Sequence, residues 1–138
     1  PMIEITDERI DTEAVLQYAT SSQAGAVVLF CGNTREFTDG KQTVFLSYEC
    51  YREMALAQMD KLRSTVMKQW DVLSVSMVHR IGQVDPGQTS VAIAVGAEHR
   101  EEAFLAGKWL IDTLKEEVPI WKKEDWSDGS SDWIHPPE

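Results

Sequence analysis

The side chains best suited to chemistry in this sequence are basic residues of its C-terminal part. Lys115 is followed by the segment VPIWKKE, in which proline forces an extended path and Trp121 can pack. Lys122 and Lys123 are then held at defined positions instead of moving freely in solvent. Fixed lysines can bind a phosphate or carboxylate, and crowding of cations lowers the pKa of a lysine toward values useful for proton transfer.

A second basic pair lies at the start of the last predicted helix. His99 and Arg100 precede two glutamates, at a position where free backbone N–H groups also attract anions. Arg35 follows a buried strand and can reach a ligand from its polar loop. Ordinary surface roles also account for these residues: Arg100 can pair with a glutamate, and Lys108 and Lys115 can extend into water. From the residues alone, both interpretations stay open.

Other reaction chemistries have little support. Cys31 and Cys50 are the only cysteines, too few for a disulfide framework or a Cys-rich zinc site, and the three histidines lack metal-ligand spacing. The sequence has no Gly-x-Ser-x-Gly elbow and no Gly-rich phosphate loop. His79-Arg80 is expected to be a satisfied structural histidine and a surface ion pair. We therefore expect no metal, no cofactor and a reducing, cytoplasmic location.

Length and charge limit the classes of protein to which this chain can belong. A chain of 138 residues predicts a single domain, 1–138. Thirteen Lys and Arg against 23 Asp and Glu give a net charge of −10, which argues against general binding to nucleic acid or to an anionic membrane. No apolar run approaches the roughly 20 residues of a membrane span. One local cationic pocket remains compatible with this average.

The elements that must position these residues follow the order strand, helix, strand, strand, helix, strand, strand, helix. Strand patterns occupy five segments: 3–5, 25–32, 43–50, 72–78 and 90–95. Helical spacing occupies three: 12–20, 51–69 and 98–118. Strands in hairpin-like pairs, with helices between the pairs, indicate an α+β fold with a mainly antiparallel sheet. The loop 33–41 is expected to turn at Asp39-Gly40, and the tail from Ile120 is assigned no regular element.

The last helix has one apolar stripe, with Lys108 and Lys115 at its border. Its members are Ala103, Phe104, Ala106, Gly107, Leu110, Ile111, Leu114 and Val118.

Several short segments occur in an order that is specific as a set. They are GAVVLFCGNTR at 25–35, LSYECY at 46–51, Met54-Ala55, HRIG at 79–82, HREEAF at 99–104, Leu114-Lys115 and PIWKKE at 119–124. From about Gly25 to Trp133 the chain resembles the large, catalytic subunit of molybdopterin synthase, an enzyme of molybdenum cofactor biosynthesis.

The resemblance implies an α/β-hammerhead fold and a homodimer of large subunits, each bound to a small ubiquitin-like sulfur-carrier subunit. The carrier's C-terminal Gly-Gly, activated as a thiocarboxylate, would enter the pocket of the large subunit. Sulfur would be transferred twice to cyclic pyranopterin monophosphate, which makes the dithiolene of molybdopterin. Because the sulfur is carried by the partner, Cys31 and Cys50 need no catalytic role.

The resemblance also implies site residues. Lys115 and Lys122 match the catalytic lysines, the first for acid–base work beside the thiocarboxylate carbon and the second to stabilise anionic intermediates or assist proton transfer. The substrate-binding positions are Asn33, Thr34, Arg35, His99, Arg100, Lys115, Lys122, Lys123 and Glu124. Asn33 and Thr34 differ from the residues that other members carry before the arginine. Arg35, His99 and Arg100 would hold phosphate and pterin.

Two other functions stay open at this stage. One is a non-catalytic α+β module that binds an anionic metabolite or a protein C-terminal tail through the same cationic groove. The other is a sulfurtransferase that carries a persulfide on Cys31 or Cys50. For the sulfur-transfer function, Lys115, Lys122, His99 and Arg100 should converge on one pocket. A separation of more than about 15 Å within every subunit pair would exceed what contact with one small substrate allows. The sequence does not decide whether Arg35 acts in its own subunit or across the dimer.

Overall fold

A computed structural model describes residues 2–134 of the chain. In chain order the elements are β1 (Ile3–Thr6), α1 (Thr12–Ala19), β2 (Ala26–Asn33), β3 (Phe37–Thr38), β4 (Lys41–Cys50), α2 (Arg52–Gln69), β5 (Val72–Arg80), β6 (Gly82–Val84), β7 (Thr89–Ala97), α3 (Arg100–Glu117), β8 (Ile120–Trp126) and β9 (Ser131–Ile134). Every predicted element is present, with its ends displaced by one or two residues.

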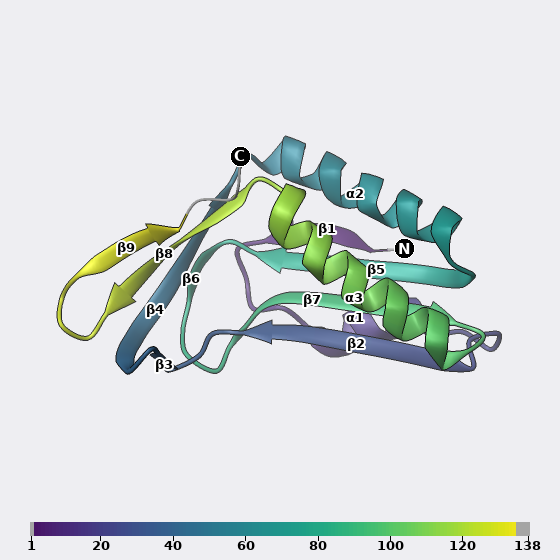
Figure 1. Ribbon diagram of the computed structural model, residues 1–138, viewed down its shortest axis with the longest axis horizontal. Coiled ribbons are helices and arrows are strands. Elements are labelled where there is room, and N and C mark those ends of the chain that lie inside the picture. The colour runs from purple at the N-terminus through teal and green to yellow at the C-terminus, as the bar shows by residue number, and fades with distance from the viewer. Residues whose placement is uncertain (1, 135–138) are drawn as a thin grey trace.

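The strands form two sheets that lie at opposite ends of the view in Figure 1. The first has the order β1-β5-β7-β2, with β1 parallel to β5 and the other neighbours antiparallel. The second has the order β3-β4-β8-β9, with β6 also paired to β4, and all its pairs are antiparallel. The predicted α+β class with a mainly antiparallel sheet is confirmed.

Helices cover both faces of the first sheet. Apolar residues of α2 and α3 pack on one face, and α1 packs on the other. Alternation along the strands separates the two sides, since Met77 and Ile93 face α2 and α3 whereas Val78 and Ala92 face α1. The apolar stripe predicted for α3 is correct except for Phe104, which is 62% exposed because it lies at the border of the stripe.

The structure adds strands that the sequence pattern did not reveal. Within the predicted loop 33–41, β3 pairs with the start of β4 around Asp39 and Gly40, whose φ angles of 50° and 79° are those of a tight hairpin turn. The tail assigned no element forms β8 and β9, and β8 pairs with β4 along most of its length. The segment after Pro119 therefore belongs to the second sheet.

Two glycines differ sharply in the space around them. In β7, a Cβ atom on Gly96 would overlap the carbonyl oxygen of Ala19, so the end of α1 can approach the sheet only over a glycine. In α3, a Cβ on Gly107 would make ordinary contacts, 3.8 Å from Val28 Cγ1 and 4.0 Å from Val95 Cγ2. The two positions form a matched pair for testing the packing.

We predict that Gly96→Ala lowers the free energy of unfolding by about 1–3 kcal/mol, because the backbone of α1 must move away from β7. Gly107→Ala should change it by no more than about 1 kcal/mol, and in the stabilising direction, because alanine favours a helix interior. Thermal and urea unfolding of both variants measure the difference. Equal stability of the two variants would contradict the described contact between α1 and β7.

Candidate functional site

The second sheet carries a row of functional side chains on one of its faces, which we call the inner face. In the pairing of β4 with β8, Tyr48 lies opposite Lys122 and Leu46 lies opposite Glu124. Directly opposed residues of an antiparallel pair project from the same face, and residues two apart on one strand do so as well. Lys122, Glu124 and Tyr48 therefore share a face, although no apolar pattern marks β8 in the sequence.

Glu124 is a buried carboxylate, only 5% exposed. Its Oε2 accepts a hydrogen bond of 2.6 Å from Thr43 Oγ1, and Thr43 is itself 2% exposed. A buried charge needs fixed polar partners, because the protein interior solvates it poorly. The structure supplies one of them from β4, the hydroxyl of Thr43.

Lys122 is half-buried within a group of charges that come from three parts of the chain. Burial lowers the pKa of its ammonium group most, and the neighbouring Lys115 lowers it further. Glu124 acts in the opposite direction, whereas Arg35 adds to the lowering. The end of α3, strand β8 and the loop after β2 thus bring Lys115, Glu124 and Arg35 close enough for their charges to act on Lys122. This part of the predicted site is assembled within a single chain.

Tyr48 and His79 lie next to these charges, and neither was predicted to belong to the site. Their rings meet edge to face, with centroids 5.0 Å apart. His79 is 4% exposed and its Nδ1 lies 2.8 Å from the carbonyl oxygen of Arg80, to which it donates. Burial lowers the pKa of His79 to about 4, and the charge of Lys115 contributes, so the ring is neutral at physiological pH.

The structural role expected for His79 is therefore confirmed. The surface ion pair expected of Arg80 is not present among the described residues, since Arg80 is half-buried and donates to Gln88 Oε1 at 3.0 Å. Its proximity to Lys115 could have been inferred from the alternation of β5, because His79 shares the face of Met77 toward α3. Burial also raises the pKa of the Tyr48 hydroxyl, and the nearby Glu124 carboxylate raises it further. Tyr48 is thus a neutral hydrogen-bonding group beside the charges.

The loop after β2 is tied to the hairpin between β6 and β7. Thr34 accepts a backbone hydrogen bond from Gly87 and donates one to Gln88, and Asn33 Oδ1 accepts from the Thr89 hydroxyl at 2.7 Å. The Thr34 hydroxyl is buried without a hydrogen-bond partner among the described residues. Arg35 is exposed and extends from this anchored base.

His99 and Arg100 lie elsewhere in the chain. They line a pocket of about 550 Å³ at the start of α3, together with Gly25, Ala26, Glu98 and Glu101. Arg100 and Lys115 occupy the two ends of α3, and at 1.5 Å per residue their backbones are about 22 Å apart. Figure 1 shows the start of α3 far from the second sheet. Within one chain, His99 and Arg100 are therefore separated from Lys115 and Lys122 by the length of α3.

Lys123 differs from its neighbours in orientation. As the residue between Lys122 and Glu124, it projects from the opposite face of β8. Its Nζ lies 4.0 Å from Asp125 Oδ1 and 5.8 Å from the ring centroid of Trp133. Lys108 is exposed and pairs with Asp112 at 2.7 Å, which is the surface role expected for it.

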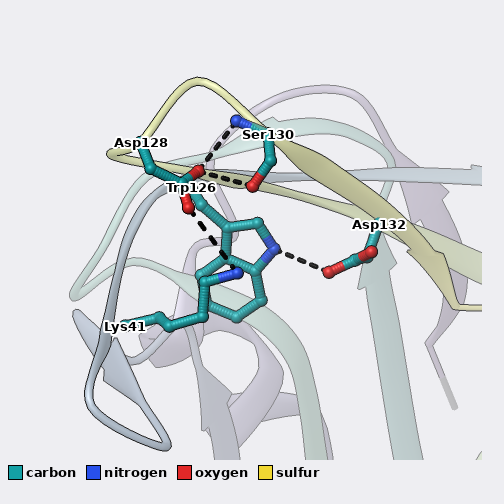
Figure 2. Close-up of polar contacts among 5 residues, drawn as sticks. All are labelled: Lys41, Trp126, Asp128, Ser130 and Asp132. Carbon is teal, nitrogen blue, oxygen red and sulfur yellow. Dashed lines mark hydrogen bonds and ion pairs between the residues drawn. The ribbon is translucent and has the colours of Figure 1, made fainter.

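The far end of β8 is anchored by a cluster around Trp126 (Figure 2). Trp126 Nε1 donates to Asp132 Oδ2 at 2.8 Å, across the hairpin of β8 and β9. Lys41 Nζ lies 4.6 Å from the centroid of the indole ring and 3.8 Å from Asp128 Oδ2. Asp128 in turn accepts from Ser130 and closes the turn. These contacts join the end of β8 to β9 and to the start of β4. They help to fix the positions of Lys122 and Glu124 along the sheet.

Among residues 2–134, no three His, Cys, Asp or Glu side chains are grouped as a metal site would require. No helix within the same residues has the length and apolar character to cross a membrane.

Comparison with known proteins places this chain in a family. The model of the MoaE protein family matches residues 5–117. The molybdopterin synthase catalytic subunit of Bacillus subtilis is 41% identical over 95% of this chain and 83% of its own length. That of Nostoc is 44% identical over 94% of this chain and 79% of its own.

Solved structures agree. Molybdopterin synthase from Staphylococcus aureus superposes with a TM-score of 0.91 at 39% identity, covering 96% of both chains. A complex of subunits 1 and 2 of molybdopterin-converting factor from Helicobacter pylori shares the fold, with a TM-score of 0.76 at 23% identity. The chain belongs to the MoaE family, the catalytic subunits of molybdopterin synthase.

Proposed function

We propose that this chain transfers two sulfur atoms from the C-terminal thiocarboxylate of a small ubiquitin-like carrier subunit to cyclic pyranopterin monophosphate. The product is the dithiolene of molybdopterin. The observation that carries the proposal is the group of Lys115, Lys122 and Arg35 beside the buried Glu124. Both reactants carry anionic groups, and fixed cations in a partly desolvated site stabilise such groups strongly.

The two lysines have different surroundings, which supports different roles. Lys122 is half-buried and its pKa is lowered, so a neutral amine is more readily available for proton transfer than on an exposed lysine. Lys115 is exposed at the end of α3 and lies beside neutral His79. On the family resemblance we assign acid–base work at the thiocarboxylate carbon to Lys115, and stabilisation of anionic intermediates or proton transfer to Lys122. The lowered pKa of Lys122 supports the second of its two roles.

The remaining predicted residues would hold the substrate. Arg35 would bind phosphate or pterin from the loop whose base includes Asn33 and Thr34. Glu124 would act from within the cluster, as a counter-charge to Lys122. Lys123 projects from the other face of β8, so a contact with substrate requires it to leave Asp125 and Trp133.

The pocket at the start of α3 supports a homodimer as the working enzyme. His99 and Arg100 are about 22 Å from Lys115 along the helix, too far to hold one small substrate together with it. A second copy of the chain can supply the missing pair from its own α3. In this arrangement each site contains Lys115, Lys122 and Arg35 of one subunit and His99 and Arg100 of the other.

The free edge of β2 is the surface that we propose for this dimer. β2 ends the first sheet, has no charged residue and exposes Phe30 to 37%. An unprotected apolar edge of this kind tends to pair with another strand. Antiparallel pairing of two β2 edges would bring the Ala26 end of one, beside His99, to the Asn33 end of the other, beside Arg35.

The first prediction from this function concerns the lysines. With thiocarboxylated carrier and cyclic pyranopterin monophosphate, Lys115→Ala and Lys122→Ala should each lower the rate of dithiolene formation by at least about 100-fold, because proton transfer and charge stabilisation are lost. Lys108→Ala, on the same helix and paired only with Asp112, should retain the wild-type rate. Full activity of Lys115→Ala would refute its catalytic role. A wild-type protein that binds carrier but forms no product would instead be a binding module.

The second prediction tests the shared site. A heterodimer of one Lys122→Ala subunit and one Arg100→Ala subunit, purified through two different tags, contains one fully intact site only if these residues act across the dimer. Its rate should be about half that of the wild type, although each parent homodimer is nearly inactive. An inactive heterodimer would contradict the shared site, because it would show that Arg100 and Lys122 of different subunits do not act in one site.

The third prediction separates carrier-borne sulfur from a cysteine persulfide. Cys31 and Cys50 are free, and burial raises the pKa of both thiols, which disfavours the nucleophilic thiolate. Free thiols also suit the reducing cytoplasm that we propose as the compartment. The Cys31→Ala, Cys50→Ala double variant should keep the wild-type rate in the carrier-dependent assay. Loss of activity in a folded double variant would favour a persulfide route.

A further inference from the structure

A β-bulge turns Thr43 toward the site. Phe45 pairs with Asp125, so regular pairing would place Val44 opposite Trp126, but Thr43 occupies that position instead. The irregularity between Thr43 and Phe45 leaves Val44 exposed and moves Thr43 to the inner face, where a regular strand would not place it. Bulges that redirect a side chain in this way are typical of the surroundings of active sites.

The redirected hydroxyl has one partner, the buried carboxylate of Glu124. Thr43 Oγ1 donates to Glu124 Oε2 at 2.6 Å, between residues that are 81 positions apart in the sequence. The backbone of Thr43 is fixed as well, because its N–H donates to the carbonyl oxygen of Glu36 at 2.7 Å. The donor is therefore rigid, and the carboxylate can take only a small range of orientations while the bond is made.

Lys122 lies two residues before Glu124 on the same face of β8, and the charge of the Glu124 carboxylate acts on its ammonium group. Lys115 from α3 and Arg35 from the loop after β2 also act on Lys122, and both are cations. Tyr48 from β4 lies opposite it and is neutral, as is His79 of β5 behind Tyr48. Among these neighbours only Glu124 is negative, so its position controls how far the cations lower the pKa of Lys122.

We propose that Thr43 is a positioning residue, whose hydrogen bond holds the Glu124 carboxylate where it serves as the counter-ion of Lys122. The inference rests on the proposed function for its relevance to sulfur transfer, but it concerns the charge of Lys122 and stands independently of turnover. Thr43 touches neither reactant in this role. It sets the protonation of a lysine through an intermediate carboxylate.

The test is a pH titration of Lys122 in the whole protein. NMR of lysines labelled with ¹³C at Cε monitors the titration, and the Lys122→Arg variant identifies the Lys122 signal. Thr43→Val keeps the shape of the side chain and removes the hydroxyl, so the carboxylate loses its fixed partner. The pKa of Lys122 should fall by about half a unit or more, because the counter-charge becomes less well placed. Thr43→Ser keeps the hydroxyl and should leave that pKa within about 0.2 units of the wild type.

Glu124→Gln distinguishes a path through Glu124 from a direct effect of Thr43. The amide oxygen can still accept from Thr43, but the counter-charge is gone, so the pKa of Lys122 should fall at least as far as in Thr43→Val. Adding Thr43→Val to Glu124→Gln should cause no further fall, since the two changes act on the same interaction. An equal further fall would overturn the proposal.

An unchanged or raised Lys122 pKa in folded Thr43→Val would also overturn it, as would failure of Thr43→Ser to behave like the wild type. Thermal unfolding and near-ultraviolet circular dichroism establish that each variant is folded. If Thr43→Val does not fold, Thr43→Ala provides the comparison with Thr43→Ser. In active enzyme, the limb of the kcat profile that belongs to Lys122 should move by the same amount as the NMR titration. A correct titration with no turnover in the wild type would refute the proposed function and leave this inference standing.

Discussion

The antiparallel pairing of β8 with β4 is the interaction on which the arrangement of this molecule depends. It returns the chain after α3 to a strand formed some seventy residues earlier and sets Lys122 opposite Tyr48 and Glu124 opposite Leu46. Displacement of the register by one residue would carry Lys122 and Glu124 to the outer face and bring Lys123 inward. The cluster of Trp126, Lys41 and Asp132 at the far end of the hairpin protects this register (Figure 2).

The electrostatics of the site follow from that register. A net charge of −10 describes the whole chain, yet around Lys122 the cations outnumber the carboxylates. Such a group is costly to assemble, because like charges repel and burial removes water from each of them. Glu124 reduces the repulsion without cancelling it. The uncompensated positive charge is then available to an anionic reactant. His79 and Tyr48 lie beside these charged groups and are themselves neutral.

The sequence predicted the elements whose apolar residues follow a regular period, including α3, β5 and β7. It also predicted Lys115 and Lys122, through their spacing and a family resemblance. It did not predict β8 as a strand, because Lys122 and Glu124 occupy the inner positions where apolar residues would mark one, and the pairing with β4 is long-range. The bulge at Val44 has no local signature either. The separation of Arg100 from Lys115, by contrast, is contained in the length of α3 and the rise of a helix.

The placement of one basic group at each end of α3 limits how this helix can vary in length. One inserted residue would lengthen the helix by about 1.5 Å and rotate one end by about 100° relative to the other. If β2 and the first sheet kept the start of the helix in place, Lys115 would turn away from Lys122 and β8 would begin in the wrong register. Insertions and deletions are therefore better tolerated in the turn at Asp39-Gly40 than in α3, because the length of this helix sets both the distance and the rotation between its two ends.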